Sequence, residues 1–99
     1  MNEYNHLIEY EQILNTHDAK LQELIQLLDF FEENSDKFKA LMSYYASEQR
    51  EEDLEKEHQG LIPDSLHRGV LSQDAIYNLY ADYRQQALRM LEIGTTFFK

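Results

Sequence analysis

The chain has 99 residues, no cysteine and a formal net charge of −10 at pH 7. A chain of this length builds one domain around one modest core, and the lack of cysteine excludes disulfides, thiolate zinc sites and cysteine nucleophiles. The start MNEYNHLIEYEQIL lacks the basic residues and the unbroken apolar run of a signal peptide, and no window approaches the roughly 18 apolar residues of a membrane span. We therefore expect a cytoplasmic protein that does not enter the membrane.

The acidic charge is concentrated in the first third of the chain. Residues 1–36 hold nine acids and one base, whereas residues 58–99 hold four of each. No basic stripe is present to neutralise phosphates, so we expect neither nucleic acid nor an anionic membrane as a partner. The acidic third can face a basic protein surface, or it can simply keep the protein in solution, which is the more common role of such charge.

The first predicted element is a long helix over residues 3–33. Apolar residues recur there at alternating spacings of three and four, the pattern of a helix with one buried face, and only His17 interrupts them. At 1.5 Å per residue this helix would be about 46 Å long. The stripe consists of Leu7, Tyr10, Leu14, His17, Leu21, Leu24, Leu28 and Phe31.

A second helix is predicted over residues 36–57, with Asn34 or Ser35 as its N-cap. A break near 46–47 is allowed, since Ser47 can cap a new segment. The heptad phase of the first helix continues through this region, so one unbroken helix from 3 to 46 is an alternative; it would have to dimerise to cover its apolar face.

The segment from 59 to 71 is predicted to be an ordered, partly buried connection. Gly60 can end the preceding helix, and Ser72 can cap the last helix, predicted over 73–98. Leu71 and Ile76 have the spacing of a hydrophobic staple. The fold class we expect is therefore all-α: an antiparallel three-helix bundle in a single domain, residues 1–99.

Histidine and acidic residues occur together at helical spacing in pairs such as His6/Glu9, Glu55/His58 and Asp64/His67. Di-metal helical bundles use such pairs together with further glutamates directed into the core, and those are missing here, so we expect no metal and no other cofactor. No nucleophile motif and no glycine-rich phosphate loop is present. We do not expect an enzyme.

One set of residues near the predicted connection has the composition of a protein-binding surface. Tyrosine and arginine are enriched at interface hot spots, and here they follow one helix face beside a His-Arg pair. Ordinary structural roles, namely ion pairing, partial burial and the helix dipole, are the more common explanation of the same residues. The candidate surface consists of His67, Arg68, Asp74, Tyr77, Tyr80 and Arg84.

The sequence GLIPDSLHRGVLSQDAIYNL, together with YYASE, resembles a family of bacterial proteins of about 100 residues, domain of unknown function 4298. The resemblance runs nearly end to end. Members have a glycine where this chain has Ala46, which weakens the expectation of a sharp break there. The resemblance implies a small cytoplasmic helical protein and assigns no activity, substrate or site residue.

Two functions follow as expectations. The first is a non-enzymatic interaction or regulatory protein that binds a partner protein or self-associates, for instance as a homodimer. The second is an acidic inhibitor that mimics nucleic acid and blocks a basic groove of its partner. A metal-dependent enzyme is the least favoured class.

Overall fold

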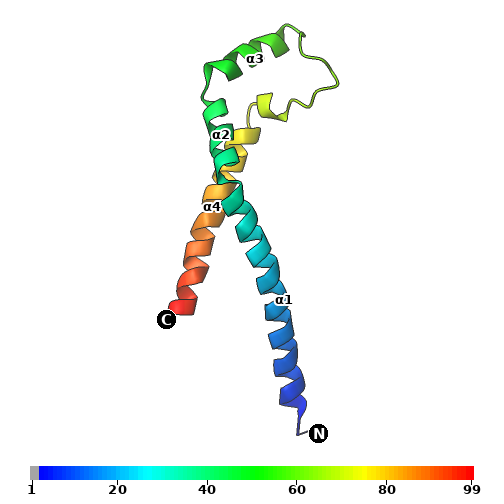
Figure 1. Cartoon of the computed structure of the whole chain (residues 1–99), viewed down its shortest axis with the longest axis vertical. Coiled ribbons are helices and arrows are strands. Elements are labelled where there is room, and N and C mark those ends of the chain that lie inside the picture. The colour runs from blue at the N-terminus through cyan, green and yellow to red at the C-terminus, as the bar shows by residue number, and fades with distance from the viewer. Residues whose placement is uncertain (1–2) are drawn as a thin grey trace. The chain divides into compact units, whose positions relative to one another are not determined.

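The computed structural model describes residues 3–99, and this part of the chain contains helices and turns but no strand. The all-α class is therefore confirmed. Four α-helices are present where three were expected, with a short 3-10 turn before and after the last of them (Figure 1). Their bounds are α1 Asn5–Glu33, α2 Ser35–Tyr45, α3 Glu48–His58, η1 Gly69–Leu71, α4 Ala75–Thr95 and η2 Thr96–Phe98.

The chain divides into two compact units, one ending at Phe38 and one running from Lys39 to Lys99. The first, unit 1, consists of α1 and the beginning of α2. The second, unit 2, contains the rest of α2, α3, η1, α4 and η2. The antiparallel three-helix bundle and the single domain stay predictions.

Helix α1 ends at Asn34, which separates it from α2. The side-chain amide of Asn34 donates a 2.9 Å hydrogen bond to the carbonyl oxygen of Phe30, and its backbone N–H bonds to the same oxygen at 3.0 Å. Asparagine side chains compete in this way for backbone carbonyls that a continuing helix would use. The chain is thus not one unbroken helix from 3 to 46, the alternative that the heptad phase had left open.

The segment expected as one helix over 36–57 is two helices, separated at Ala46 and Ser47. Ser47 has an extended backbone, and its hydroxyl accepts a hydrogen bond from the backbone N–H of Arg50 at 3.2 Å. The same hydroxyl donates to the carbonyl oxygen of Tyr44 at 2.6 Å. One serine between the two helices therefore bonds to the last turn of α2 and to the first turn of α3, which restrains the angle between them.

Helix α3 ends in a Schellman motif at Gly60, the position predicted for helix termination. Gly60 has φ +72°, a conformation that residues with a Cβ adopt at a cost. The N–H of Leu61 bonds to the carbonyl of Lys56 at 2.9 Å, and the N–H of Gly60 bonds to the carbonyl of Glu57 at 3.0 Å. The chain then passes through the loop 61–68 to η1.

Two side chains in the described part of the chain are buried, Leu71 at 9% exposure and Ile76 at 3%. They are the pair that the sequence predicted as a hydrophobic staple. Helix α4 begins at Ala75, two residues after the predicted start, and the hydroxyl of Ser72 accepts a hydrogen bond from the backbone N–H of Ala75 at 3.2 Å. The N-cap of α4 is Asp74 instead of the predicted Ser72, so Leu71 and Ile76 do not hold the N′ and N4 positions of a staple, although both are buried.

No helix among residues 3–99 combines the length and the apolar character that crossing a lipid bilayer requires.

Replacing Ser47 by alanine should lower the free energy of unfolding by about 0.5–2 kcal/mol, because the first turn of α3 loses its cap. Ser43→Ala is the matched control: Ser43 is exposed within α2, where alanine is the better helix former. Urea denaturation followed by circular dichroism measures both variants. Equal midpoints for the two would contradict the role of Ser47.

Candidate functional site

Arg50 of α3 links three segments of unit 2. Its Nε donates to the carbonyl oxygen of Val70 at 3.2 Å, and one of its terminal nitrogens donates to the carbonyl oxygen of Ser72 at 3.1 Å. These two carbonyls bracket Leu71, the buried residue of η1. A guanidinium suits this task because its donors form a fixed fork that reaches two acceptors at once.

The same guanidinium lies over the ring of Tyr45 in α2, with 4.8 Å between its central carbon and the ring centroid. A cation over an aromatic face at this distance is attracted by the ring quadrupole. Arg50 thereby connects α2, α3 and the η1 turn, which are separated by up to 27 residues of sequence.

A second polar contact joins α2 to α3. The hydroxyl of Tyr44 donates to one carboxylate oxygen of Asp53 at 2.6 Å, and the side-chain amide of Gln49 donates to the other at 2.9 Å. The hydrogen bond from Tyr44, followed by that from Gln49, lowers the pKa of the Asp53 carboxyl. The same bond to Asp53 is the main cause that raises the pKa of Tyr44, with partial burial and the carboxylate charge adding to it and the charge of Arg50 opposing it.

An apolar hollow of about 240 Å³ lies between α2 and α4. The side chains that line it face it with apolar atoms. Tyrosine and methionine dominate the lining, and these residues adapt well to an apolar group from another molecule. The lining residues of this aromatic hollow are Met42, Tyr45, Ile76, Tyr77 and Tyr80.

A second hollow of about 370 Å³, here called the loop pocket, lies between α3 and the loop 61–68. Its apolar part comes mostly from the family-like motif, and its polar part comes from α2, α3 and the end of the loop. The apolar lining is Leu61, Ile62, Pro63, Leu66, Val70 and Leu71, and the polar lining is Tyr44, Asp53, Lys56, His67 and Arg68.

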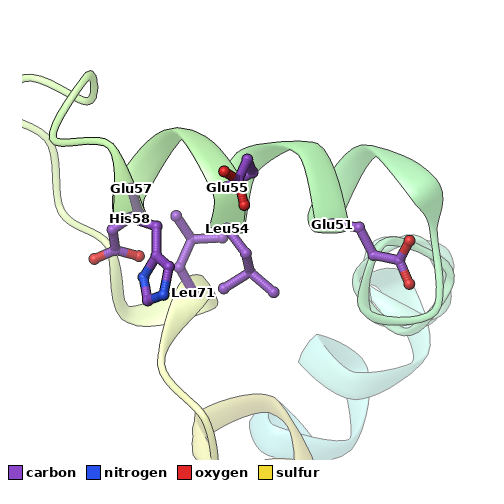
Figure 2. Close-up of a pocket in the computed structure, with 6 residues that line it drawn as sticks. All are labelled: Glu51, Leu54, Glu55, Glu57, His58 and Leu71. Carbon is purple, nitrogen blue, oxygen red and sulfur yellow. The ribbon is translucent and has the colours of Figure 1, made fainter.

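A larger hollow of about 550 Å³ lies along the other side of α3 (Figure 2). Figure 2 shows Leu54 and Leu71 next to each other below α3, with the imidazole of His58 beside them and Glu51 at the far end of the helix. Glutamates line this hollow, yet no three His, Asp or Glu side chains anywhere in residues 3–99 are arranged to hold a metal ion.

The structure divides the predicted surface between two places. Tyr77 and Tyr80 line the aromatic hollow, whereas His67 and Arg68 line the loop pocket, where Arg68 pairs with Glu57 at 3.9 Å. Asp74 stands at the start of α4, and its carbonyl accepts from the N–H of Asn78 at 2.8 Å. Arg84 is exposed on α4 and lines neither hollow.

Sequence reasoning missed the residues that shape both hollows, above all Tyr44, Arg50 and Asp53. Their segment, SEQREEDLEKEHQG and the residues before it, reads as a solvated acidic helix because charged residues dominate it. One signal was available: YYASE joins two aromatic residues to a capping serine. Only the folded chain shows that Arg50, in the first turn of α3, bonds to the distant residues Val70 and Ser72.

Replacing Arg50 by methionine should destabilise unit 2 by about 1–3 kcal/mol, because two carbonyls lose a charged donor. Arg50→Lys should recover little of this, since an ammonium cannot reach both acceptors and stack on Tyr45. Hydrogen exchange at the amides of residues 69–74 should speed up in both variants. Lys39→Met, an exposed change on α2 that also removes one positive charge, is the control and should leave exchange unchanged.

The Tyr44–Asp53 bond predicts a specific pH profile of stability. The pKa of Asp53 is lowered by folding, so its contribution is present above the unfolded pKa near 3.9 and is lost as pH falls through the folded value. The pKa of Tyr44 is raised, so its contribution is present below about 10 and is lost as pH rises through the folded value.

The stability difference between wild type and Tyr44→Phe should therefore be constant from about pH 5 to 9 and shrink in acid and in alkali. Urea midpoints measured across this range test it. A difference that is independent of pH would show that the bond does not contribute in solution.

Comparison with known proteins adds a family but no activity. No curated protein and no solved structure matches the chain significantly. A family model described as Domain of unknown function (DUF4298) matches residues 7–93, which include nearly all of α1, the loop pocket and most of α4. With the match covering all but the ends of the sequence, the chain belongs to the DUF4298 family.

Proposed function

We propose that this protein is a non-enzymatic interaction module that binds another protein through the apolar stripe of α1. The partner surface that fits it is apolar along its centre and basic at its edge. The observation that carries the proposal is the apolar face of α1, which has no second element to pack against within its own unit.

Six large apolar side chains on one face of α1 are exposed by between 42% and 64%. Unit 1 contains only α1 and the first residues of α2, so the unit by itself cannot bury this face. Burying one leucine fully is worth about 1.5–3 kcal/mol, which makes six such side chains a strong driving force for association. The residues of this stripe are Leu7, Tyr10, Leu14, Leu21, Leu24 and Leu28.

The acidic residues beside the apolar stripe indicate which charge the partner surface should carry. Glu11, Asp18 and Glu32 each directly follow a stripe position of the heptad pattern, so they flank the apolar face. Lys20 is the one basic residue of the first 36, and it pairs with Glu23 at 3.3 Å. A basic rim on the partner complements these carboxylates and speeds association.

This charge favours a different protein over a second copy as the occupant. Two copies of α1 side by side would bring together two segments that each carry nine acids and one base. Like charges facing across a helix pair oppose association and weaken it most at low salt.

The aromatic hollow of unit 2 offers a second contact of the same kind. Tyr77 and Tyr80 belong to the surface proposed from the sequence, and the hollow that they line accepts an apolar side chain without leaving a polar group unpaired.

The acidic nucleic-acid mimic is the competing function. It uses carboxylates alone, so its binding falls steeply with salt and does not depend on the stripe. The six apolar residues at helical spacing favour the interaction module, because a mimic of phosphates has no need of them.

A direct test uses a synthetic amphipathic helix of leucine and lysine as the probe, titrated against the full chain by isothermal calorimetry. Leu21→Asp should weaken binding at least about tenfold, since it places a charge in the centre of the stripe. Ala19→Asp is the matched control: it adds the same charge on the opposite side of α1 and should leave affinity unchanged or raise it.

Three results would contradict the proposal. Binding that Leu21→Asp strengthens as much as Ala19→Asp would show attraction by charge alone, as the mimic requires. If a synthetic helix of leucine and glutamate binds as tightly as the leucine–lysine helix, the partner surface needs no basic edge. A wild-type dimer in light scattering that Leu21→Asp converts to a monomer would replace the foreign partner by a second copy.

A further inference from the structure

We infer that the loop pocket binds an amphipathic carboxylate, a compound or chain end with a hydrocarbon body and one carboxylate group. The inference is independent of the function proposed for α1. The lining of this pocket combines six apolar residues, three basic side chains and one acid, Asp53. Both carboxylate oxygens of Asp53 already accept hydrogen bonds.

The floor of the pocket is suited to a hydrocarbon body. Six of its lining residues are apolar, and Leu61 and Leu66 remain 65% and 56% exposed although they belong to an ordered loop. A ligand lying between them removes this apolar surface from water. The volume of about 370 Å³ is within the range of small-molecule sites.

The rim of the pocket is suited to an anion. Lys56 and His67 line it, and neither side chain has a hydrogen bond or ion pair to another described residue. Arg68 has one contact, 3.9 Å from its Nε to a carboxylate oxygen of Glu57, which is beyond hydrogen-bond distance and leaves its terminal nitrogens available. Arginine binds carboxylates through two parallel bonds, and a lysine adds a point charge.

The acid of the pocket does not favour a cationic ligand. Both carboxylate oxygens of Asp53 already accept hydrogen bonds, one from Tyr44 and one from Gln49. The two cationic groups of the lining, Lys56 and Arg68, lie near acids, because the charge of Lys56 acts on Asp53 and Arg68 pairs with Glu57 at 3.9 Å. The N–H donors that both side chains keep for a ligand are the reason for assigning a carboxylate.

The segment that forms the floor is GLIPDSLHRGVL, part of the stretch that carries the family resemblance. Its termini are fixed by the Schellman motif at Gly60 and by Arg50 at Val70 and Ser72. The pocket is thus formed before a ligand arrives, which reduces the entropy lost on binding.

The test is a nuclear magnetic resonance titration of the full chain with hexanoate and 3-phenylpropionate. Both should shift the amide signals of residues 53–71 at millimolar concentration. Hexylamine and hexanol, which keep the hydrocarbon and lack the carboxylate, should not. A peptide ending in leucine, with a free or an amidated C-terminus, distinguishes a chain end from a free acid as the source of the carboxylate.

Lys56→Met and Arg68→Met should each raise the Kd at least about tenfold. Lys39→Met, which removes the same charge outside the pocket, should leave the Kd unchanged, and Lys56→Arg should retain binding. Leu66→Trp should block the floor, and because Leu66 is exposed, circular dichroism should show an intact fold.

The inference is overturned if hexylamine gives the same shifts as hexanoate, if no carboxylate shifts these amides, or if Lys39→Met weakens binding as much as Lys56→Met. If the peptide with a free C-terminus binds and the two small acids do not, the pocket is upheld and its ligand is a protein C-terminus.

Discussion

The arrangement of unit 2 depends on how the η1 turn is fixed. Leu71 and Ile76 are its buried side chains, and Arg50 bonds to the carbonyls on either side of Leu71. Two apolar side chains are a very small core for any folded unit. A charged side chain that satisfies two backbone carbonyls from a neighbouring helix is therefore a large share of what holds the loop, α3 and α4 together.

This fixed turn has a consequence for the surface. Because Arg50 and the Tyr44–Asp53 bond hold α2, α3 and η1 in one geometry, two hollows of different chemistry form on either side of these contacts. One is wholly apolar and lined by aromatic rings. The other combines apolar residues with the basic side chains of Lys56, His67 and Arg68. The polar contacts thus shape surfaces that a larger hydrophobic core would have filled.

Unit 1 presents the opposite situation. A single helix cannot cover its own apolar face, whatever its length, since all of its side chains point outward. In the proposed function, the repeat from Leu7 to Leu28 therefore calls for a partner without specifying which one. The acidic residues beside the stripe narrow the choice, because they disfavour a like-charged surface and favour a basic one.

The sequence by itself determined the all-α class, the end of α3 at Gly60, the cap at Ser47 and the burial of Leu71 and Ile76. These features are local: each depends on propensity, capping or spacing within a few residues. Other features were decided by tertiary structure alone. Arg50 bonds to carbonyls 20 and 22 residues away, and a helix that reads as solvated charge lines two hollows. Contacts between segments distant in sequence leave no periodic signal, because they arise only when the loop returns the chain to the helix that it left.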